Sequence, residues 1–474
     1  MIANPLWSPQ DVADLTLGEL QGTPSERLTG VSIDTRTIAP HEIFFAIQGD
    51  RFDGHTFVDR AIAAGAGLNV VERQKLDLVP QDGPYLLVDD AMVALRRLAE
   101  GARVRSSAKR VAITGSVGKT STKEALRTVL TPSGQVHAAN ASFNNHWGVP
   151  LTLARLPQSA DYGVFEIGMN HAGEITPLTQ LVRPHVAIVT TVAAAHLENF
   201  ESIEGIAYAK AEIFKGVTDG GAALINADID HTELLIEAAE ACGISRIFTF
   251  GESALADVVL KRVQLLPDCS TVSARIFDQD IVYKIGAPGR HLVQNSLAVL
   301  AAAVLVGADL ARAGLAFQSV AAEKGRGARH TLSFADGGTA TLIDESYNAN
   351  PTSVKAALEL LAAAVPTGQG RRIAVLGDML ELGEDEAELH AALLDPIQKA
   401  NVDLVYLVGP RMAALWEALP KALRGGYRTD AKDIISPINE ALMGGDVVLV
   451  KSSNGIKTGK VVEFLIDRYT PESV

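Results

Sequence analysis

The segment from Gly115 to Ser121 carries the residues whose types and spacing point most directly to chemistry. It reads Gly-Ser-Val-Gly-Lys-Thr-Ser, follows a short β-rich run and opens a helical pattern. Glycines let backbone N–H groups face an anion, and the helix N-terminus adds positive potential. In such a loop Lys119 can reach the β- and γ-phosphates, and the hydroxyl of Thr120 can ligate Mg²⁺. The segment therefore predicts a nucleotide site, as a shortened variant of the standard phosphate loop; an ordinary strand–helix turn is the alternative.

Three further polar side chains lie in or directly after apolar segments of the same region. Glu166 interrupts the run VFEIG, His196 follows the strand pattern HVAIVTT, and Lys210 lies in the helical pattern AYAKAEIF. A buried carboxylate is costly unless it meets a cation. Ligands bind at the carboxyl ends of parallel strands, so we expect Thr120, Glu166 and His196 to converge around Mg²⁺ and phosphate. Taken singly, each residue also has an ordinary explanation, namely an exposed strand end, a structural histidine and a solvated lysine.

The elements that must position these residues fall into three predicted α/β domains. Residues 1–105 predict a small α/β domain, with a polar and basic connector at 100–110. Residues 106–327 alternate buried strands with helical stretches and predict a mostly parallel sheet, with a hairpin at 270–286 around an Asp-Gln-Asp turn. Residues 328–474 alternate strand and helix four times, as in a Rossmann-like, doubly wound fold.

Individual elements can be named from their patterns. The expected strands are Val164–Ile167, Val186–Thr190, Ala223–Ile225, Ile247–Phe250, Ala340–Ile343, Ile373–Leu376, Leu404–Val408 and Val447–Val450. The expected helices of the last domain are Ser353–Ala364, Glu386–Ala400, Met412–Leu419 and Lys457–Asp467.

Composition excludes several classes of protein. The net charge of −14 disfavours a nucleic-acid partner held by a broad basic field. Two cysteines, Cys242 and Cys269, form no motif, so a disulfide framework or a cysteine metal site is not expected. The first residues lack a secretory signal pattern, and the longest apolar run, Leu297–Ala308, is too short to span a bilayer. We expect a cytoplasmic monomer without membrane insertion.

These motifs and several longer strings resemble those of the Mur ligases, the ATP-dependent amide-forming enzymes of peptidoglycan synthesis. The resemblance runs nearly end to end. Its strings are TGSVGKTS (114–121), FNNHWGVPLTL (143–153), FEIGMNHAGEI (165–175), AHLENF (195–200), AKAEIF (209–214) and GRHLVQN (289–295), together with SIDTRTIAPHEIFFAIQG (32–49) and RFDGHTF (51–57), which are similar to the family's UDP-sugar-binding first domain.

Two strings in the last domain select within the family. SYNANP (346–351) and GDMLELG (377–383) are typical of the member that adds D-alanyl-D-alanine to UDP-N-acetylmuramoyl-tripeptide. The resemblance implies that ATP phosphorylates the peptide carboxylate, and that the dipeptide amine then attacks the acyl phosphate through a tetrahedral intermediate. Both steps bring anions together, so cations must neutralise charge.

The resemblance also implies a set of catalytic and metal-binding residues. Lys119, Glu166, His196 and Lys210 would be catalytic, with Thr120 and Glu166 holding one Mg²⁺ and His196 and Lys210 serving a second. In the family the lysine matching Lys210 is carbamylated to N6-carboxylysine, and Lys215 is the alternative here. The ATP phosphates would lie on Gly115, Ser116, Val117, Gly118, Lys119, Thr120 and Ser121.

The remaining implied contacts come from all three domains. Asn295 matches an adenine contact, Arg326 an arginine near the γ-phosphate, and Glu345 an acidic residue on the ATP ribose, with Asp344 as its competitor. The third domain would therefore close on the second. The implied substrate contacts are Ser32, Asp34, Thr35 and Arg36 for UDP, Asn144, Asn145 and His146 for the acceptor or UDP-N-acetylmuramoyl group, Asn170, His171 and Glu174 for the acyl phosphate, and Tyr347, Asn348 and Asn350 for the dipeptide. A capped turn and a helix cap are the plain alternatives for the first and last sets.

Three other functions stay open at this point. A sister ligase would add a different amino acid, a phosphate-loop kinase or NTPase would need no first domain, and a non-catalytic binding protein would need no two-metal arrangement.

Overall fold

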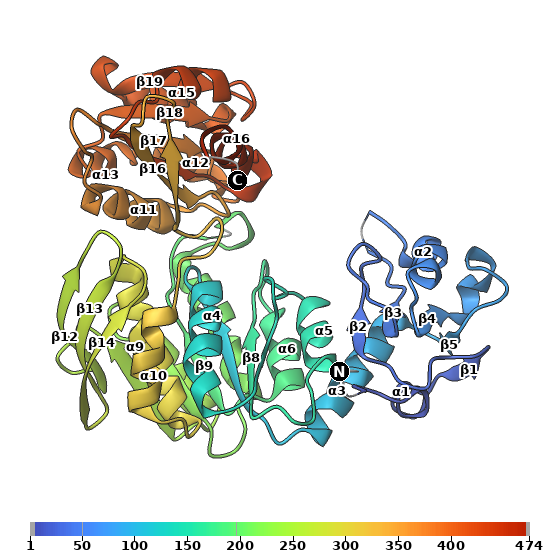
Figure 1. Ribbon diagram of the computed structural model, residues 1–474. Helices are drawn as coiled ribbons and strands as arrows, with labels where there is room; N and C mark the ends of the chain where they lie inside the picture. The colour runs from blue at the N-terminus through green and yellow to red at the C-terminus, as the bar shows by residue number, and fades with distance from the viewer. Residues whose placement is uncertain (1–4, 50, 196, 471–474) are drawn as a thin grey trace.

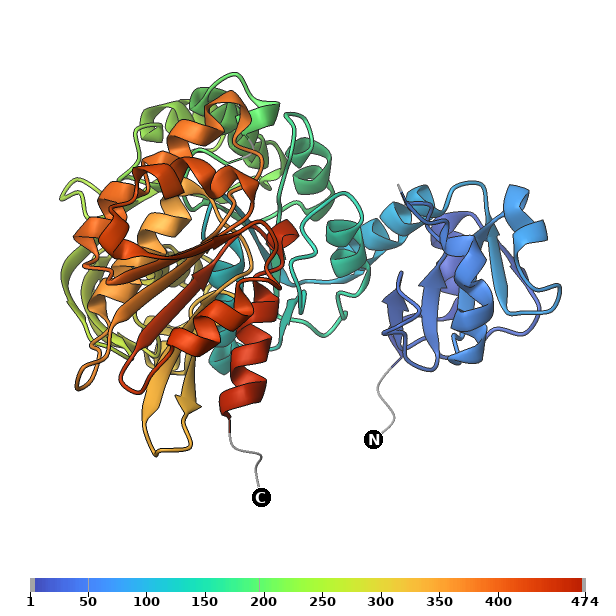
Figure 2. The same cartoon turned by 90° about the horizontal axis from the view of Figure 1, so that it is seen from above.

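The computed structural model describes residues 5–49, 51–195 and 197–470, which fold around three β-sheets. We call β1–β5 with α1–α3 the N-terminal unit, β6–β14 with α4–α10 the central unit, and β15–β20 with α11–α16 the C-terminal unit. In Figure 1 the C-terminal unit lies above the central unit, and the N-terminal unit stands to one side. The view from above in Figure 2 separates the N-terminal unit from the C-terminal one in the same way.

The N-terminal unit is a five-stranded sheet in the order β1-β5-β4-β3-β2, parallel except for β1. Its last helix begins at Asp90, whose side chain accepts from the N–H of Val93, and buries Leu95 and Leu98 on one face. The prediction of a connector at 100–110 was wrong, because this helix continues to Arg105 and Lys109 already begins β6. The elements are α1 (Pro9–Thr16), β1 (Glu19–Gln21), β2 (Gly30–Ser32), β3 (Glu42–Phe45), α2 (Val58–Ala63), β4 (Leu68–Glu72), β5 (Tyr85–Val88) and α3 (Ala91–Arg105).

The central unit is a nine-stranded sheet in the order β14-β13-β12-β11-β10-β9-β6-β8-β7. It is parallel from β7 to β12, and β12–β14 are antiparallel. Its strands are β6 (Lys109–Thr114), β7 (Val136–Ala138), β8 (Tyr162–Glu166), β9 (Val186–Val189), β10 (Ala222–Asn226), β11 (Arg246–Gly251), β12 (Val258–Leu265), β13 (Ser270–Ile276) and β14 (Gln279–Ile285). Its helices are α4 (Lys119–Leu130), α5 (Gly148–Ala154), α6 (Ile175–Val182), α7 (Ile203–Ala211), α8 (Thr232–Ala241), α9 (Arg290–Leu305) and α10 (Leu310–Ala316).

Alternate residues of the central strands pack against two helical layers. Val111 and Ile113 of β6 lie in one core with α4, α9 and α10, whereas Ala112 lies in the other with α5–α8. The predicted hairpin is present, but its turn is the two-residue pair Phe277–Asp278. Phe277 has a φ of +55°, a conformation of tight hairpin turns.

The C-terminal unit is a six-stranded sheet in the order β15-β16-β20-β17-β18-β19, parallel except for β15. The predicted helix at 386–400 is two short helices, because the proline at 396 cannot donate to the carbonyl of residue 392. The elements are β15 (Ala328–Ser333), β16 (Thr339–Glu345), α11 (Pro351–Ala363), β17 (Arg372–Gly377), α12 (Glu386–Ala391), α13 (Leu394–Lys399), β18 (Leu404–Val408), α14 (Ala413–Ala418), β19 (Arg424–Arg428), α15 (Ile435–Ala441), β20 (Val447–Lys451) and α16 (Gly459–Tyr469).

The fold brings the carboxyl ends of two parallel sheets together. One cavity is lined by residues that follow β6 and β8 in the central unit and by residues at the ends of β16 and β20 in the C-terminal unit. This is the edge at which open α/β sheets bind ligands. Over the described ranges, the search for a helix with the length and apolar character of a bilayer span finds none.

Candidate active site between the central and C-terminal units

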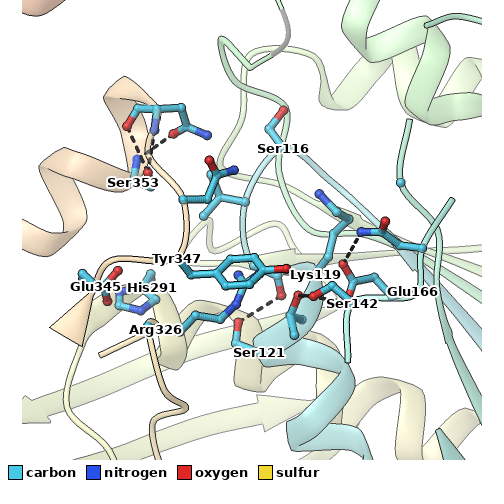
Figure 3. Close-up of a pocket in the computed structure, with 18 of the residues that line it drawn as sticks. Ser116, Lys119, Ser121, Ser142, Glu166, His291, Arg326, Glu345, Tyr347 and Ser353 are labelled. Atoms are coloured by element: carbon cyan, nitrogen blue, oxygen red, sulfur yellow. Dashed lines mark hydrogen bonds between the residues drawn. The ribbon is translucent and has the colours of Figure 1, made fainter. Parts of the chain in front are cut away.

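A cavity of about 370 Å³ lies where the central unit meets the C-terminal unit. Figure 3 shows the phosphate loop, with Ser116, Lys119 and Ser121, opposite Glu345, Tyr347 and Ser353 of the C-terminal unit. The structure therefore brings together most of the predicted nucleotide and dipeptide residues. The predicted residues among its lining are Ser116, Val117, Gly118, Lys119, Thr120, Ser121, Asn144, Asn145, Glu166, Asn170, Glu174, Arg326, Glu345, Tyr347, Asn348 and Asn350.

The phosphate loop is held in shape by the neighbouring strand end. The Oγ1 of Thr190 donates to the carbonyl of Val117 at 2.6 Å, and the Ser116 hydroxyl donates to the carbonyl of Ala193 at 2.9 Å. Gly118 precedes α4 with a φ of +89°, and a Cβ there would lie 2.6 Å from the Asn295 amide nitrogen. Glycine is needed at this position both for its backbone conformation and for the close approach.

Polar side chains at positions 120 and 144 face the Glu166 carboxylate at the end of β8. The Thr120 hydroxyl donates to Glu166 Oε2 at 2.9 Å, and Asn144 Nδ2 donates to Glu166 Oε1 at 2.8 Å. Lys119 Nζ donates to the Gly115 carbonyl at 2.7 Å. Burial lowers the pKa of Lys119, the nearby Glu166 opposes that shift, and the charge of Arg326 adds to it. The buried carboxylate at 166 thus has partners, and the alternative of an exposed strand end is excluded.

This oxygen-rich group suits a magnesium ion better than a transition metal. Thr120, Glu166 and Ser142, whose hydroxyl lies 3.1 Å from that of Thr120, supply hydroxyl and carboxylate oxygens. Mg²⁺ prefers oxygen ligands and is usually held by one or two carboxylates together with substrate phosphates. Among the described residues no group of three or more His, Cys, Asp or Glu side chains could hold a metal on its own. The residues present therefore fit an ion shared with a nucleotide.

Lys210 lies below the surface rather than in the cavity wall. It is 2% exposed, near the end of α7. Burial, with the charge of Lys119 as the second cause, holds the pKa of Lys210 well below its ordinary value. Burial of this kind disfavours the protonated form of a lysine. Lys215, the alternative, is exposed. His196 lies outside the described residues.

The C-terminal side contributes an arginine, a tyrosine and a carboxylate. The Arg326 guanidinium lies 4.3 Å from the centre of the Tyr347 ring, a cation–π pair that Figure 3 shows in the cavity. Glu345 accepts from Lys451 Nζ at 3.1 Å. Its competitor Asp344 points away into the unit, where it accepts from the N–H groups of Gly325 and Ser346. Successive side chains of a strand face opposite sides, which separates the two acids.

Other predicted residues have a local structural role or lie elsewhere. Asn350 caps α11 through a bond from the Ser353 N–H, so the helix-cap interpretation is confirmed, although its side chain also lines the cavity. Asn295 lines a small adjoining cavity that shares Ser121, Leu292 and Arg326 with the main one. His146 is absent from the cavity lining and packs edge-on against Trp147.

The predicted UDP contacts stand apart from this cavity, in the N-terminal unit. The Asp34 carboxylate accepts from the backbone and the guanidinium of Arg36, and the Ser32 hydroxyl donates to the carbonyl of Asp34 at 3.2 Å. Thr35 lies in the same turn. These bonds are those of a capped turn. None of these residues lines the cavity that contains the phosphate loop.

Several lining residues were not predicted. They are Ser142, Gly168, Met169, His291, Leu292, Gly325, Ser353 and Lys451. Ser142 and Ser353 sit in polar stretches without a distinguishing pattern. Lys451 ends a strand that reads as an ordinary apolar run.

Comparison with known proteins follows the same division of the chain. Residues 27–103 match the family model described as "Mur ligase family, catalytic domain", 113–303 match "Mur ligase middle domain", and 331–454 match "Mur ligase, glutamate ligase domain". A protein of Rickettsia prowazekii called UDP-N-acetylmuramoyl-tripeptide–D-alanyl-D-alanine ligase is 33% identical, over 97% of this chain and 99% of the relative.

Solved structures give the same result. A crystal structure of MurF from Acinetobacter baumannii superposes with a TM-score of 0.83 at 29% identity, covering 97% of this chain and 99% of that one. The MurF ligase from Thermotoga maritima in complex with ADP superposes with a TM-score of 0.76 at 26% identity, covering 96% of this chain and 99% of that one.

Proposed function

Because the chain belongs to the Mur ligase family, we propose that it joins D-alanyl-D-alanine to UDP-N-acetylmuramoyl-tripeptide at the expense of ATP. The observation that carries the proposal is the pairing of Thr120 with Glu166 beside Lys119, directly across one cavity from the SYNANP loop. The relatives that match nearly end to end bear the name of this reaction. The reaction belongs to the assembly of peptidoglycan precursors.

The reaction has two chemical steps. An oxygen of the tripeptide carboxylate attacks the γ-phosphorus of ATP, and the bond to the β-phosphate oxygen breaks to release ADP. The dipeptide amine then attacks the acyl carbon, loses a proton, and the C–O bond to phosphate breaks. Each step places several negative charges close together, so preorganised cations and N–H groups are the main catalytic resource.

The residues of the central unit fit the phosphate side of this reaction. Lys119 and the N–H groups of the loop would hold the ATP phosphates, and Asn295 would contact the adenine. Thr120 and Glu166 would hold one Mg²⁺, and His196 and carbamylated Lys210 a second. A bound magnesium ion neutralises phosphate charge and so lowers the barrier to attack. The burial of Lys210 lowers its pKa and so fits carbamylation, because only an unprotonated amine adds CO₂.

The residues of the C-terminal unit fit contacts with the γ-phosphate, the ribose and the dipeptide. Arg326 would approach the γ-phosphate, Glu345 the ribose, and Tyr347, Asn348 and Asn350 the dipeptide. The UDP-N-acetylmuramoyl-tripeptide would lie on Asn144, Asn145 and His146, with its UDP group on Ser32, Asp34, Thr35 and Arg36 in the N-terminal unit.

The proposal extends to organisation and location. The three domains would be 1–105, 106–327 and 328–474. A monomer would suffice, because the described residues supply both sides of the cavity from one chain. We place the enzyme in the cytoplasm, the compartment that supplies ATP and UDP-linked precursors.

A phosphate-release assay tests the proposal. Purified protein with ATP, Mg²⁺ and UDP-N-acetylmuramoyl-tripeptide should release phosphate when D-alanyl-D-alanine is added, and mass spectrometry should show the pentapeptide product. Turnover only with single amino acids would identify a sister ligase instead. Phosphate release that needs neither the peptide nor residues 1–100 would identify an NTPase.

A further inference from the structure

Lys451 is a buried lysine at the edge of the cavity whose role the reaction leaves unassigned. It ends β20, directly opposite Glu345 at the end of β16, and is 2% exposed. Its Nζ donates to the carbonyl of Asn348 at 2.8 Å and lies 3.1 Å from Glu345 Oε2. Burying an ammonium group is unfavourable unless it is paired and hydrogen-bonded. These two contacts therefore bind together the carboxylate at 345 and the SYNANP loop.

The same strand end anchors that loop a second time. The Ser453 hydroxyl donates to the carbonyl of Ala349 at 3.3 Å and accepts from the N–H of Leu380 at 3.0 Å. The Ser453 N–H donates to the carbonyl of Asp378 at 3.1 Å. Residues 451–453 thus connect the SYNANP loop with the loop that follows β17. Of these contacts, only the ion pair of Lys451 involves a side chain predicted to meet the nucleotide.

We propose that Lys451 is a positioning residue that couples the nucleotide side of the cavity to the dipeptide side. This inference rests on the proposed function, in which Glu345 meets the ribose and Asn348 the dipeptide. A nucleotide that fixes the Glu345 carboxylate also fixes the ammonium beside it. The ammonium then holds the Asn348 carbonyl, and with it the loop, in one conformation, so the ordering cost of binding the dipeptide falls.

The coupling predicts that the nucleotide and the dipeptide each raise the affinity of the protein for the other. ADP should raise the affinity for D-alanyl-D-alanine, and the dipeptide should raise the affinity for ADP by the same factor. A residue with a purely structural role would change stability without changing this factor.

Calorimetry on the full chain with UDP-N-acetylmuramoyl-tripeptide present measures the factor. We expect ADP to tighten dipeptide binding about tenfold in the wild type. We expect the same in Lys460→Met, which changes an exposed lysine of α16. Lys451→Met should remove most of the factor and raise the KM for the dipeptide more than the KM for ATP, and Lys451→Arg should restore part of it. Retention of the wild-type factor in Lys451→Met, or no factor in the wild type, would overturn the proposal.

A second variant and a hydrogen-exchange measurement test the coupling if the first experiment fails. If Lys451→Met does not fold, Glu345→Gln carries the test, because it removes the charge that the lysine pairs with; full coupling in that variant would refute the inference. If the wild type binds no dipeptide, the proposed function fails. Hydrogen exchange then decides the coupling separately: ADP should slow exchange at residues 346–350 in the wild type but not in Lys451→Met, and equal slowing in both would refute it.

Discussion

The two junctions of the central unit differ in chemistry. The junction with the N-terminal unit is apolar and continuous: Trp7 and Leu28 share one hydrophobic core with Val149 and Leu151 of α5. Across the other junction the cores are separate, since those of the C-terminal unit contain only residues from Leu332 onward. What joins it to the central unit is polar, as in the bond from the N–H of Glu198 to the carbonyl of Glu381 at 3.3 Å.

The difference assigns different roles to the two junctions. An apolar junction resembles a domain core and resists movement, whereas a polar junction with few buried contacts permits it. The linking segment contains Gly325 and Gly327, both with positive φ. We infer that the N-terminal unit is fixed to the central unit, and that the cavity opens and closes through the C-terminal unit. Changes at the polar junction should therefore alter activity, and changes at the apolar junction should alter stability.

The largest effect is expected in the cavity that lies at the polar junction. Glu166→Gln removes a charge that bonds Thr120 and Asn144, and should lower ligase activity about a thousandfold or more, because charge stabilisation dominates such reactions. Its melting temperature should stay near that of the wild type. Glu240→Gln, a change at an exposed carboxylate of α8, is the control and should leave the activity near that of the wild type. Near-normal turnover by Glu166→Gln would place the chemistry elsewhere.

The apolar junction should show the reverse behaviour. Trp7 is buried, donates from Nε1 to the carbonyl of Ala154 at 3.1 Å, and lies under the guanidinium of Arg105. Trp7→Ala should lower the free energy of unfolding by about 3–5 kcal/mol, as for other buried tryptophans. Val104→Ala, at an exposed position on α3, should leave it unchanged. Denaturant unfolding measures the free energy of unfolding of both variants. A wild-type value for Trp7→Ala would contradict the distinction between the two junctions.

Acidification should also lower the free energy of unfolding, through two histidines of the central unit, by a smaller amount for each ring. Burial lowers the pKa of His137, which bonds the carbonyl of Thr152 in α5, to about 4, and burial also lowers the pKa of His185 to about 4. The unfolded chain protonates these rings near pH 6.5. Their contribution is therefore fully present above pH 6.5 and is lost as the pH falls toward 4, by at most about 3 kcal/mol per ring and less where water reaches it. His137→Gln should flatten this part of the stability–pH curve; an unchanged slope would contradict it.

Particular residues show how far the sequence could predict this molecule. Spacing alone located Lys119, Thr120 and Glu166, because a glycine-rich turn before a helix and a carboxylate within an apolar strand are rare patterns. The choice between Asp344 and Glu345 needed the strand's facing, which the sequence does not fix.

Other features depend on contacts between distant segments. Lys451 acquires its meaning only from β16, its neighbour in space but 106 residues away in the chain. Residues 100–110 are polar and basic and so predicted a linker, but residues 91–105 form a helix whose Leu95 and Leu98 are buried. Arginine favours helices, so a basic composition does not by itself indicate a linker.

The comparison of the junctions can be tested directly by distance measurements from one labelled cysteine. Cys242 is exposed in the central unit and Cys269 is buried, so a spin label attaches at the former. A second label at Val365→Cys, exposed in the C-terminal unit, or at Asp59→Cys, exposed in the N-terminal unit, reports each junction separately. When a non-hydrolysable ATP analogue and UDP-N-acetylmuramoyl-tripeptide are added, the mean distance between labels at 242 and 365 should shift and its distribution should narrow. The distance between labels at 242 and 59 should stay constant. A fixed distance to 365, or a shift in the distance to 59, would contradict the account.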